Sequence, residues 1–199
     1  MRKGKTFIVS GPSGVGKSTV INQVMKQYPN LKFSVSATTR PQRPTEVHGV
    51  NYYFMNREMF EQMILEEKLL EYTEYVGNYY GTPEQPVDQL LAEGYDILLD
   101  VEPVGALNVK RRRPDAVLIF MLAPSFSILE KRLSGRGDTA PELVRNRLDR
   151  ARWEYTQANQ YDYLVVNDDV NKAVGEICSI ITAEKCKTKE RNHYLLKED

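Results

Sequence analysis

The sequence has few of the residues that bind zinc or form disulfides. Among 199 residues there are two cysteines, Cys178 and Cys186, and two histidines, His48 and His193. The cysteines lie eight positions apart in a predicted C-terminal helix, a rise of about 12 Å that is too long for a disulfide. Two histidines without clustered cysteines give a zinc site no evident ligands. Together with the lack of a signal peptide, this scarcity favours a cytoplasmic protein.

An excess of charge of either sign is also lacking. Lys plus Arg and Asp plus Glu both number 27, the formal net charge is zero, and the isoelectric point is about 6.8. Such a chain has no global attraction to nucleic acid or to an anionic membrane surface. The longest apolar run, 116–123, is far shorter than a membrane-spanning helix. We therefore expect neither nucleic acid nor membrane as a partner, and any basic site must be local.

One stretch has the spacing of a phosphate-binding loop, because Gly11 is followed after four residues by Gly16, Lys17 and Ser18. Glycines let successive backbone N–H groups curl around phosphate oxygens, and the positive end of a following helix adds to the attraction. The ammonium of Lys17 suits the β- and γ-phosphates of a triphosphate, and the hydroxyl of Ser18 suits Mg²⁺. The predicted triphosphate site, which the resemblance described below implies to be the ATP site, comprises Gly11, Pro12, Ser13, Gly14, Val15, Gly16, Lys17, Ser18 and Thr19.

Hydrophobic periodicity places this loop between a strand and a helix. The apolar run at 5–10 is typical of a buried parallel strand, and apolar residues recur at helical spacing from Val20 until Pro29. Further strands are predicted at 31–36, 50–55, 71–76, 79–82, 96–101, 116–122 and 163–166, and further helices at 57–70, 86–93, 105–113, 125–133, 142–155 and 170–186. The charged end from Lys187 is predicted to be frayed.

Alternating strands and helices, with the phosphate loop after the first strand, predict an α/β fold. Its core is a three-layer parallel sheet with helices on both faces and the ligand at the carboxyl ends of the strands. Two pieces interrupt the pattern: the polar, proline-containing loop 37–49 with tyrosine-rich strands after it, and a helix that carries Arg145, Arg147, Arg150 and Arg152. We expect one domain over 1–199, with its core at about 1–33, 84–131 and 153–199, a β-rich lobe at about 34–83 and a helical lid at about 132–152.

Several motifs in the same order resemble the bacterial guanylate kinases, which are P-loop nucleoside monophosphate kinases. They are Ser36-Ala37-Thr38-Thr39-Arg40 with Arg43, Glu46 and Gly49; Gly77-Asn78-Tyr79-Tyr80-Gly81; Arg132-Leu133 with Gly135-Arg136-Gly137; and Val166-Asn167-Asp168-Asp169. The resemblance covers nearly the whole chain. It implies reversible, Mg²⁺-dependent transfer of the ATP γ-phosphoryl group to GMP, which gives ADP and GDP, and it assigns GMP to the β-rich lobe.

The resemblance also implies which residues bind GMP. They are Ser36, Arg40, Arg43, Tyr52, Glu71, Tyr80, Thr82, Asp100 and Glu102. Arg40 and Arg43 would hold the acceptor phosphate, and Glu71 would accept hydrogen bonds from N1–H and the 2-amino group of guanine. Taken alone, the two arginines have a solvated basic loop as their alternative, and Glu71 is more typical of the surface of a strand. The acidic pair Asp100 and Glu102 would lie near magnesium and the acceptor nucleoside, with roles that the sequence does not divide.

By the same resemblance, catalysis would depend on Lys17 and on the lid arginines Arg132, Arg136 and Arg147, with Asn167 beside the adenine of ATP. A basic helix face and a turn-forming asparagine are the plainer interpretations. Mg²⁺ is the implied cofactor, with Ser18 and Asp100 as its implied ligands, either directly or through water. No general base is required, because the attacking phosphate oxygen is already anionic.

Three positions depart from the family pattern: Thr45 replaces a usual glycine, Asn51 a frequent aspartate and Val104 a usual glutamine. A β-branched residue resists positive φ, so Thr45 puts the conformation of the acceptor loop in question. Two alternative functions remain at this stage, a non-catalytic guanylate-kinase-like binding module and a kinase for another phosphorylated small molecule. The oligomeric state is open between monomer and homodimer.

Overall fold

The computed structural model describes residues 3–135 and 141–195. In these residues the strands are β1 (Thr6–Ser10), β2 (Leu31–Phe33), β3 (Ala37–Thr38), β4 (Tyr53–Phe54), β5 (Leu69–Tyr75), β6 (Asn78–Pro83), β7 (Asp96–Asp100), β8 (Val117–Leu122) and β9 (Tyr163–Val166). The α-helices are α1 (Lys17–Gln27), α2 (Arg57–Leu65), α3 (Glu84–Ala92), α4 (Pro103–Arg112), α5 (Phe126–Ser134), α6 (Pro141–Thr156), α7 (Val170–Cys186) and α8 (Thr188–Arg191).

A five-stranded sheet of order β2-β7-β1-β8-β9 forms the centre of the described chain, and each of its strand pairs is parallel. Strand β1 lies in the middle and is buried along its whole length. Because β1 and β7 run in the same direction with Val9 opposite Asp100, the phosphate loop and the acidic end of β7 leave the sheet at the same edge. The predicted parallel sheet is confirmed.

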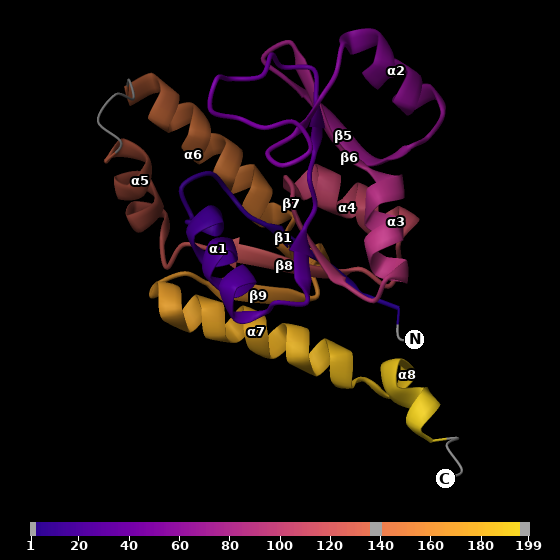
Figure 1. The fold of residues 1–199 in the computed structure, drawn as a ribbon. Coiled ribbons are helices and arrows are strands. Elements are labelled where there is room, and N and C mark those ends of the chain that lie inside the picture. The colour runs from indigo at the N-terminus through magenta and orange to yellow at the C-terminus, as the bar shows by residue number, and fades with distance from the viewer. Residues whose placement is uncertain (1–2, 136–140, 196–199) are drawn as a thin grey trace.

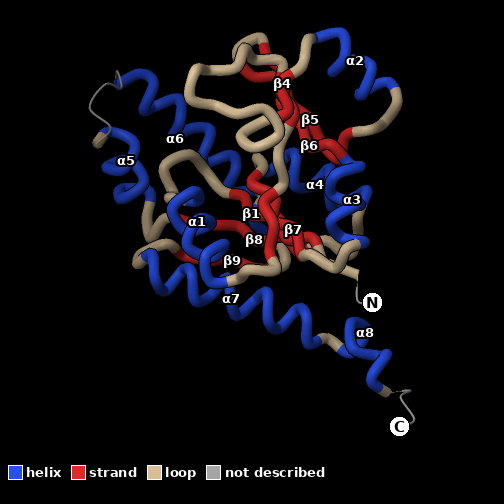
Figure 2. The backbone as a smooth tube through the Cα atoms, viewed as in Figure 1, coloured by secondary structure: helices blue, strands red, loops and turns tan. Residues whose placement is uncertain are grey.

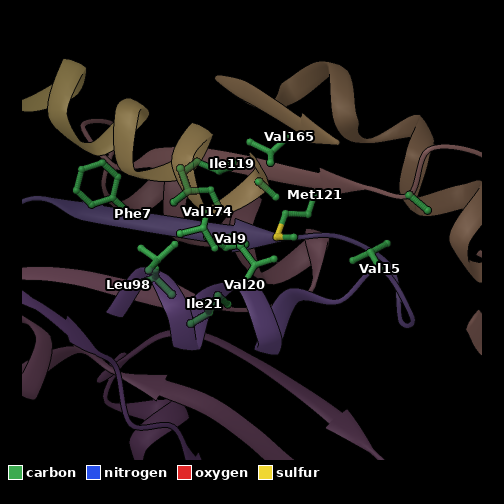
Figure 3. Packing of buried hydrophobic residues seen from close by; sticks show 14 of the residues in the cluster. Phe7, Val9, Val15, Val20, Ile21, Leu98, Ile119, Met121, Val165 and Val174 are labelled. Atoms are coloured by element: carbon green, nitrogen blue, oxygen red, sulfur yellow. The ribbon is translucent and has the colours of Figure 1, made fainter. Parts of the chain in front are cut away.

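Helices cover both faces of this sheet. On one face, Phe7 and Val9 pack into a cluster with residues of α1 and α7, as Figure 3 shows. On the other face, Ile8 packs with residues of α3 and α4. Neighbouring residues of β1 thus alternate between two apolar clusters, as expected for a strand buried on both sides. The predicted three-layer core is also confirmed.

A second sheet, of order β4-β3-β6-β5, forms a lobe above the central sheet in Figures 1 and 2. Strands β5 and β6 pair in antiparallel fashion, and Val76 and Gly77 between them have φ angles of 48° and 71°. Phe60 of α2 packs with Ala37 and Leu69 into a small separate apolar cluster. The β-rich insertion is therefore present and has its own buried residues.

Some predicted boundaries in the lobe are wrong. Helix α2 ends at Leu65 instead of residue 70, because Glu67 adopts a φ of 53° and turns the chain into β5. Leu69 and Leu70 are buried as strand residues, and apolar spacing alone does not separate this outcome from a longer helix. The strand predicted at 50–55 is reduced to β4, since only its two residues pair with β3. In the central sheet, the strand predicted at 31–36 is reduced to β2, whose three residues pair with β7.

The segment after Lys187, predicted to be frayed, instead forms the short helix α8. The ammonium of Lys5 donates a hydrogen bond to Glu190 of α8 at 2.8 Å and lies 3.3 Å from Glu184 of α7. The Lys5 side chain is only 4% exposed. Figure 1 shows α8 below the start of the chain, so a partner distant in sequence orders this end.

Cys178 and Cys186 both lie in α7 and are unpaired, as the spacing predicts. Within 3–135 and 141–195, no helix combines the length and the hydropathy that a membrane span requires.

Replacing Lys5 by Ala should lower the free energy of unfolding by about 3 kcal/mol, because it removes one of the two ammonium groups that compensate the buried carboxylate of Glu184. The loss should stay near the low end of the range for buried pairs, since Tyr163 and Lys187 still contact Glu184. Urea denaturation measures it. Lys172→Ala is the matched control, because its pair with Asp168 is half-exposed and contributes less than about 1 kcal/mol. Equal losses in both variants would contradict the prediction.

Candidate functional site

The phosphate-binding loop connects β1 to α1. Gly16, the residue before the helix, has a φ of 94°, and an added Cβ there would lie 2.6 Å from the side-chain nitrogen of Asn167. Glycine is therefore required at this position by both conformation and space. No side chain of the described residues caps the start of α1, so its first N–H groups are available to an anion.

The loop borders a cavity of about 560 Å³, here named the loop cavity. The lining residues are Gly11, Pro12, Ser13, Gly14, Gly16, Lys17, Ser18 and Thr19 from the loop and α1, Tyr75, Asp100, Val101 and Glu102, and Arg147, Arg150 and Glu154 from α6. The ammonium of Lys17 donates to the carbonyl oxygen of Gly11 at 2.6 Å and lies 4.0 Å from the carboxylate of Asp100. A cation is thus held between the loop and the end of β7.

A second cavity of about 330 Å³, the lobe cavity, lies between the second sheet and the core. The lining includes Ser36, Tyr52, Glu71 and Tyr80 of the predicted GMP set, together with Asp100 and Glu102. Five residues line both cavities: Tyr75, Asp100, Val101, Glu102 and Arg150. The two cavities therefore adjoin at the carboxyl end of β7, which is named the junction below.

Glu71 is the buried carboxylate of the lobe cavity. Thr82 donates a hydrogen bond to its Oε1 at 2.6 Å. Burial raises the pKa of Glu71, the Thr82 hydrogen bond opposes this, and the negative charge of Glu102 adds to it. Gly105 of α4 makes room for the carboxylate, because a Cβ on Gly105 would lie 2.8 Å from Oε2 of Glu71. This role of Gly105 could not be predicted from the sequence, since a glycine in a helix does not reveal which side chain it faces.

Asp100 ends β7 beside Lys17. Burial raises the pKa of its carboxyl group, and the nearby Lys17 ammonium partly reverses that shift. Asp100 and Ser18 both line the loop cavity, so a carboxylate and a hydroxyl oxygen face the same space. The described residues contain no cluster of three or more metal-ligating side chains. A pair of hard oxygen donors without a full cage fits Mg²⁺, which is usually held by one or two carboxylates and by substrate phosphates.

Glu46 orders the loop that carries the two predicted phosphate-binding arginines. Arg40 donates to both oxygens of Glu46 at 2.8 and 3.0 Å, and the backbone N–H of Arg43 donates to Glu46 at 2.9 Å. The Arg40 hydrogen bond lowers the pKa of Glu46, and the pair correspondingly raises the pKa of Arg40. Neither arginine lines the loop cavity or the lobe cavity. The structure therefore brings Tyr52 and Tyr80 to the lobe cavity but leaves the two arginines outside it.

The three departures from the family pattern are accommodated. Thr45 is not among the described residues with positive φ, so its β-branched side chain causes no strain of that kind. Asn51 accepts a hydrogen bond from the N–H of Val47 at 2.8 Å and closes the turn between them. Val104 lines the lobe cavity as a half-exposed apolar residue.

Of the predicted lid arginines, Arg136 lies outside the described residues. Arg147 of α6 lines the loop cavity. Arg132 of α5 donates to the carbonyl oxygens of Val15 at 3.3 Å and of Asn167 at 2.9 Å. The side chain of Asn167 also donates to Val15, at 2.7 Å. Arg132 and Asn167 thus contact the back of the phosphate loop, and their predicted contacts with ATP stay predictions.

Comparisons with known proteins agree with this geometry. A family model described as guanylate kinase matches residues 3–184. A guanylate kinase of Carboxydothermus hydrogenoformans is 46% identical over 198 residues, which are 100% of this chain and 97% of the relative. One of Thermus thermophilus is 50% identical over 183 residues, 92% of this chain and 83% of the relative. A crystal structure of guanylate kinase from Anaplasma phagocytophilum has a TM-score of 0.74 at 31% identity and covers 94% of this chain and 89% of that chain.

The raised pKa of Glu71 has a consequence for stability. Because the folded protein disfavours the charged carboxylate, the free energy of unfolding should fall as the pH rises from the ordinary range of a glutamic acid through the raised pKa. Glu71→Gln removes this penalty and can keep the hydrogen bond from Thr82. At pH 7 the variant should therefore match or exceed the wild type in thermal midpoint, and the difference should shrink below about pH 4.

Differential scanning calorimetry of both proteins between pH 4 and pH 8 measures this difference. Glu130→Gln, in which the replaced carboxylate is exposed on α5, is the control and should show no such trend. The difference in thermal midpoint, Glu71→Gln minus wild type, should be larger at pH 7 than at pH 4. A smaller difference at pH 7 than at pH 4 would contradict the expectation.

Proposed function

The chain belongs to the guanylate kinase family, and from that premise we propose that ATP binds in the loop cavity and GMP in the lobe cavity. As a guanylate kinase, the chain catalyses reversible phosphoryl transfer between ATP and GMP. The observation that carries the assignment of the two cavities is their junction at the end of β7, with the phosphate loop on one side and the buried Glu71 on the other. Two phosphate groups can meet at such a junction without crossing solvent.

On the ATP side, the N–H groups of the loop and of the first turn of α1 bind the phosphate oxygens. Lys17 exchanges the Gly11 carbonyl for the β- and γ-phosphates and stabilises the charge that develops during transfer. Ser18 and Asp100 would hold Mg²⁺, which neutralises phosphate charge when bound. Arg132, Arg136 and Arg147 would close over the triphosphate, and Asn167 would lie beside the adenine.

On the GMP side, Glu71 accepts hydrogen bonds from guanine N1–H and the 2-amino group. Two such donors favour the charged carboxylate and so offset the burial that raises its pKa. Thr82 and Ser36 complete the base site. Arg40 and Arg43 bind the GMP phosphate together with the hydroxyl groups of Tyr52 and Tyr80, which requires the loop around Glu46 to move toward the lobe cavity.

The reaction needs positioning more than proton transfer. An anionic oxygen of GMP attacks the γ-phosphorus, a new O–P bond forms, and the bond to the β–γ bridging oxygen breaks with the electron pair left on ADP. Closure of the lid at about 132–152 over the core excludes water, which would otherwise compete as acceptor. We also propose a cytoplasmic location, for which the two unpaired cysteines are suited, and a monomer or homodimer as the active form.

An acceptor screen with MgATP tests the assignment of the base site. GMP should give strong turnover, dGMP less, and AMP, CMP and UMP little, because only guanine offers two adjacent donors to Glu71. A coupled assay of ADP release measures each rate. Lys17→Ala is the control for catalysis and should lose at least about 10² in kcat. Equal turnover of AMP and GMP would overturn the base site, and turnover retained in Lys17→Ala would overturn the role of the loop.

Gly105→Ala tests the packing behind Glu71. The added methyl group should displace the carboxylate and leave guanine N–H groups poorly paired, so KM for GMP should rise by about tenfold or more. KM for ATP should hardly change. Gly175→Ala in α7 is the matched control, because an added Cβ there meets no atom within 4 Å. Unchanged GMP kinetics in Gly105→Ala would show that Glu71 tolerates the methyl group.

A further inference from the structure

The junction between the two cavities contains one charged side chain, that of Arg150, to which neither the sequence motifs nor the comparisons assign a role. Of the five residues that line both cavities, two are carboxylates, Asp100 and Glu102, and Arg150 is the single cation. Arg150 comes from α6, whose long axis Figure 1 shows running beneath the lobe toward the central sheet. A group that moves from ATP to GMP must pass this place.

Two carboxylates, those of Glu154 and Glu102, accept hydrogen bonds from the guanidinium of Arg150. Its Nε donates to Glu154 at 3.0 Å, and its Nη2 donates to Glu102 at 3.2 Å. Glu154 is buried on the same helix, so its hydrogen bond holds the Nε atom of Arg150 in place. The face of the guanidinium lies 4.8 Å from the centroid of the Trp153 ring, which limits its rotation. The fork is therefore presented to the junction in a restricted orientation.

The bond to Glu102 is the exchangeable one. The side chains of Arg150 and Glu102 are 51% and 59% exposed, whereas that of Glu154 is 7% exposed. An exposed ion pair contributes little to stability, because water screens it. A phosphate oxygen can therefore replace Glu102 on Nη2 while Glu154 keeps Nε in place.

The two carboxylates at the junction, Asp100 and Glu102, are each offset by a nearby cation. Lys17 lies 4.0 Å from Asp100 and offsets that carboxylate. Arg150 is the group that offsets Glu102. Without it, the negative phosphates of both nucleotides would approach an uncompensated carboxylate at the place where charge builds up in the transition state.

We propose that Arg150 binds the phosphoryl group during its transfer between the two nucleotides. The inference rests on the proposed arrangement of ATP and GMP in the two cavities. When both are bound, Nη2 leaves Glu102 and donates to an oxygen of the transferring group. Arg150 gives up no proton: the acceptor oxygen bonds to the γ-phosphorus, and the bridging oxygen leaves on ADP with its electron pair. This makes Arg150 a cation that acts from the α6 side, in addition to Lys17 from the loop.

The alternative is a purely structural role, in which the ion pair between Arg150 and Glu102 holds α6 against the start of α4. Kinetics of Arg150→Ala and Arg150→Lys separate the two roles. Arg150→Ala should lower kcat about 10²-fold at saturating MgATP and GMP and change either KM less than about threefold, because the lost contact forms only in the transition state. Arg150→Lys should recover part of kcat, since it restores the charge without the bidentate fork.

Arg152→Ala is the matched control on the same helix. Arg152 pairs with Asp149, is 62% exposed and lines neither cavity, so its removal should leave kcat unchanged. Guanidinium chloride at concentrations far below those that unfold proteins should raise the activity of Arg150→Ala and of no other variant. Arg150→Ala should lower the thermal midpoint, because it removes the partner of the buried Glu154, whereas the midpoints of Arg150→Lys and Arg152→Ala should lie close to that of the wild type.

Two results would overturn the proposal. One is a kcat of Arg150→Ala within threefold of the wild type. The other is a loss of kcat that follows a fall in thermal midpoint and that neither lysine nor guanidinium restores, which is the behaviour of a structural tie. If the wild type itself fails to phosphorylate GMP, the proposed function is wrong, and this outcome is distinct from an active wild type with an active Arg150→Ala.

Discussion

The parallel pairing of β1 with β7 is the constraint on which the rest of the site depends. With Val9 opposite Asp100, the phosphate loop and the acidic end of β7 emerge side by side from one edge of the sheet. The β7 end then borders both cavities, so the proposed donor site at the phosphate loop and the proposed acceptor site in the lobe share a wall. In this arrangement, the register between β1 and β7 brings the two proposed nucleotide sites together without direct contact between the loop and the lobe.

A second feature is that four cations of the site, Lys17, Arg40, Arg132 and Arg150, already have oxygen partners. Lys17 and Arg132 donate to backbone carbonyls, Arg40 donates to Glu46, and Arg150 donates to two carboxylates. These pairs satisfy the donors before nucleotides bind, at little cost to stability where they are exposed. Phosphate oxygens can take over the same N–H groups with more charge. Binding is therefore an exchange of acceptors, and its net gain depends on how buried the original partner is. By this measure Arg150 can leave Glu102 but not Glu154.

Local patterns in the sequence predicted the core well, because each strand and helix of the core has a periodicity that matches its burial. The phosphate loop could be placed to the residue. The end of α2 could not, since the turn at Glu67 depends on Leu69 and Leu70 being buried under the lobe. Nor could the order of α8, whose partner Lys5 is 185 positions away from Glu190. Arg150 was visible only as one charge on a basic helix, because the sequence does not say which of several arginines faces a cavity.

Glu71 illustrates how specificity opposes stability in this fold. A carboxylate buried against Gly105, with one hydroxyl donor from Thr82, is poorly solvated, and its raised pKa records that cost. In the proposed GMP site, guanine would supply the two donors that the other side of the carboxylate lacks, so the ligand would recover free energy that the fold gives up. A base with an acceptor at the same place would leave both the base and the carboxylate unsatisfied. On this proposal, discrimination between bases would arise from an unfavourable burial of Glu71 that exists before any nucleotide binds.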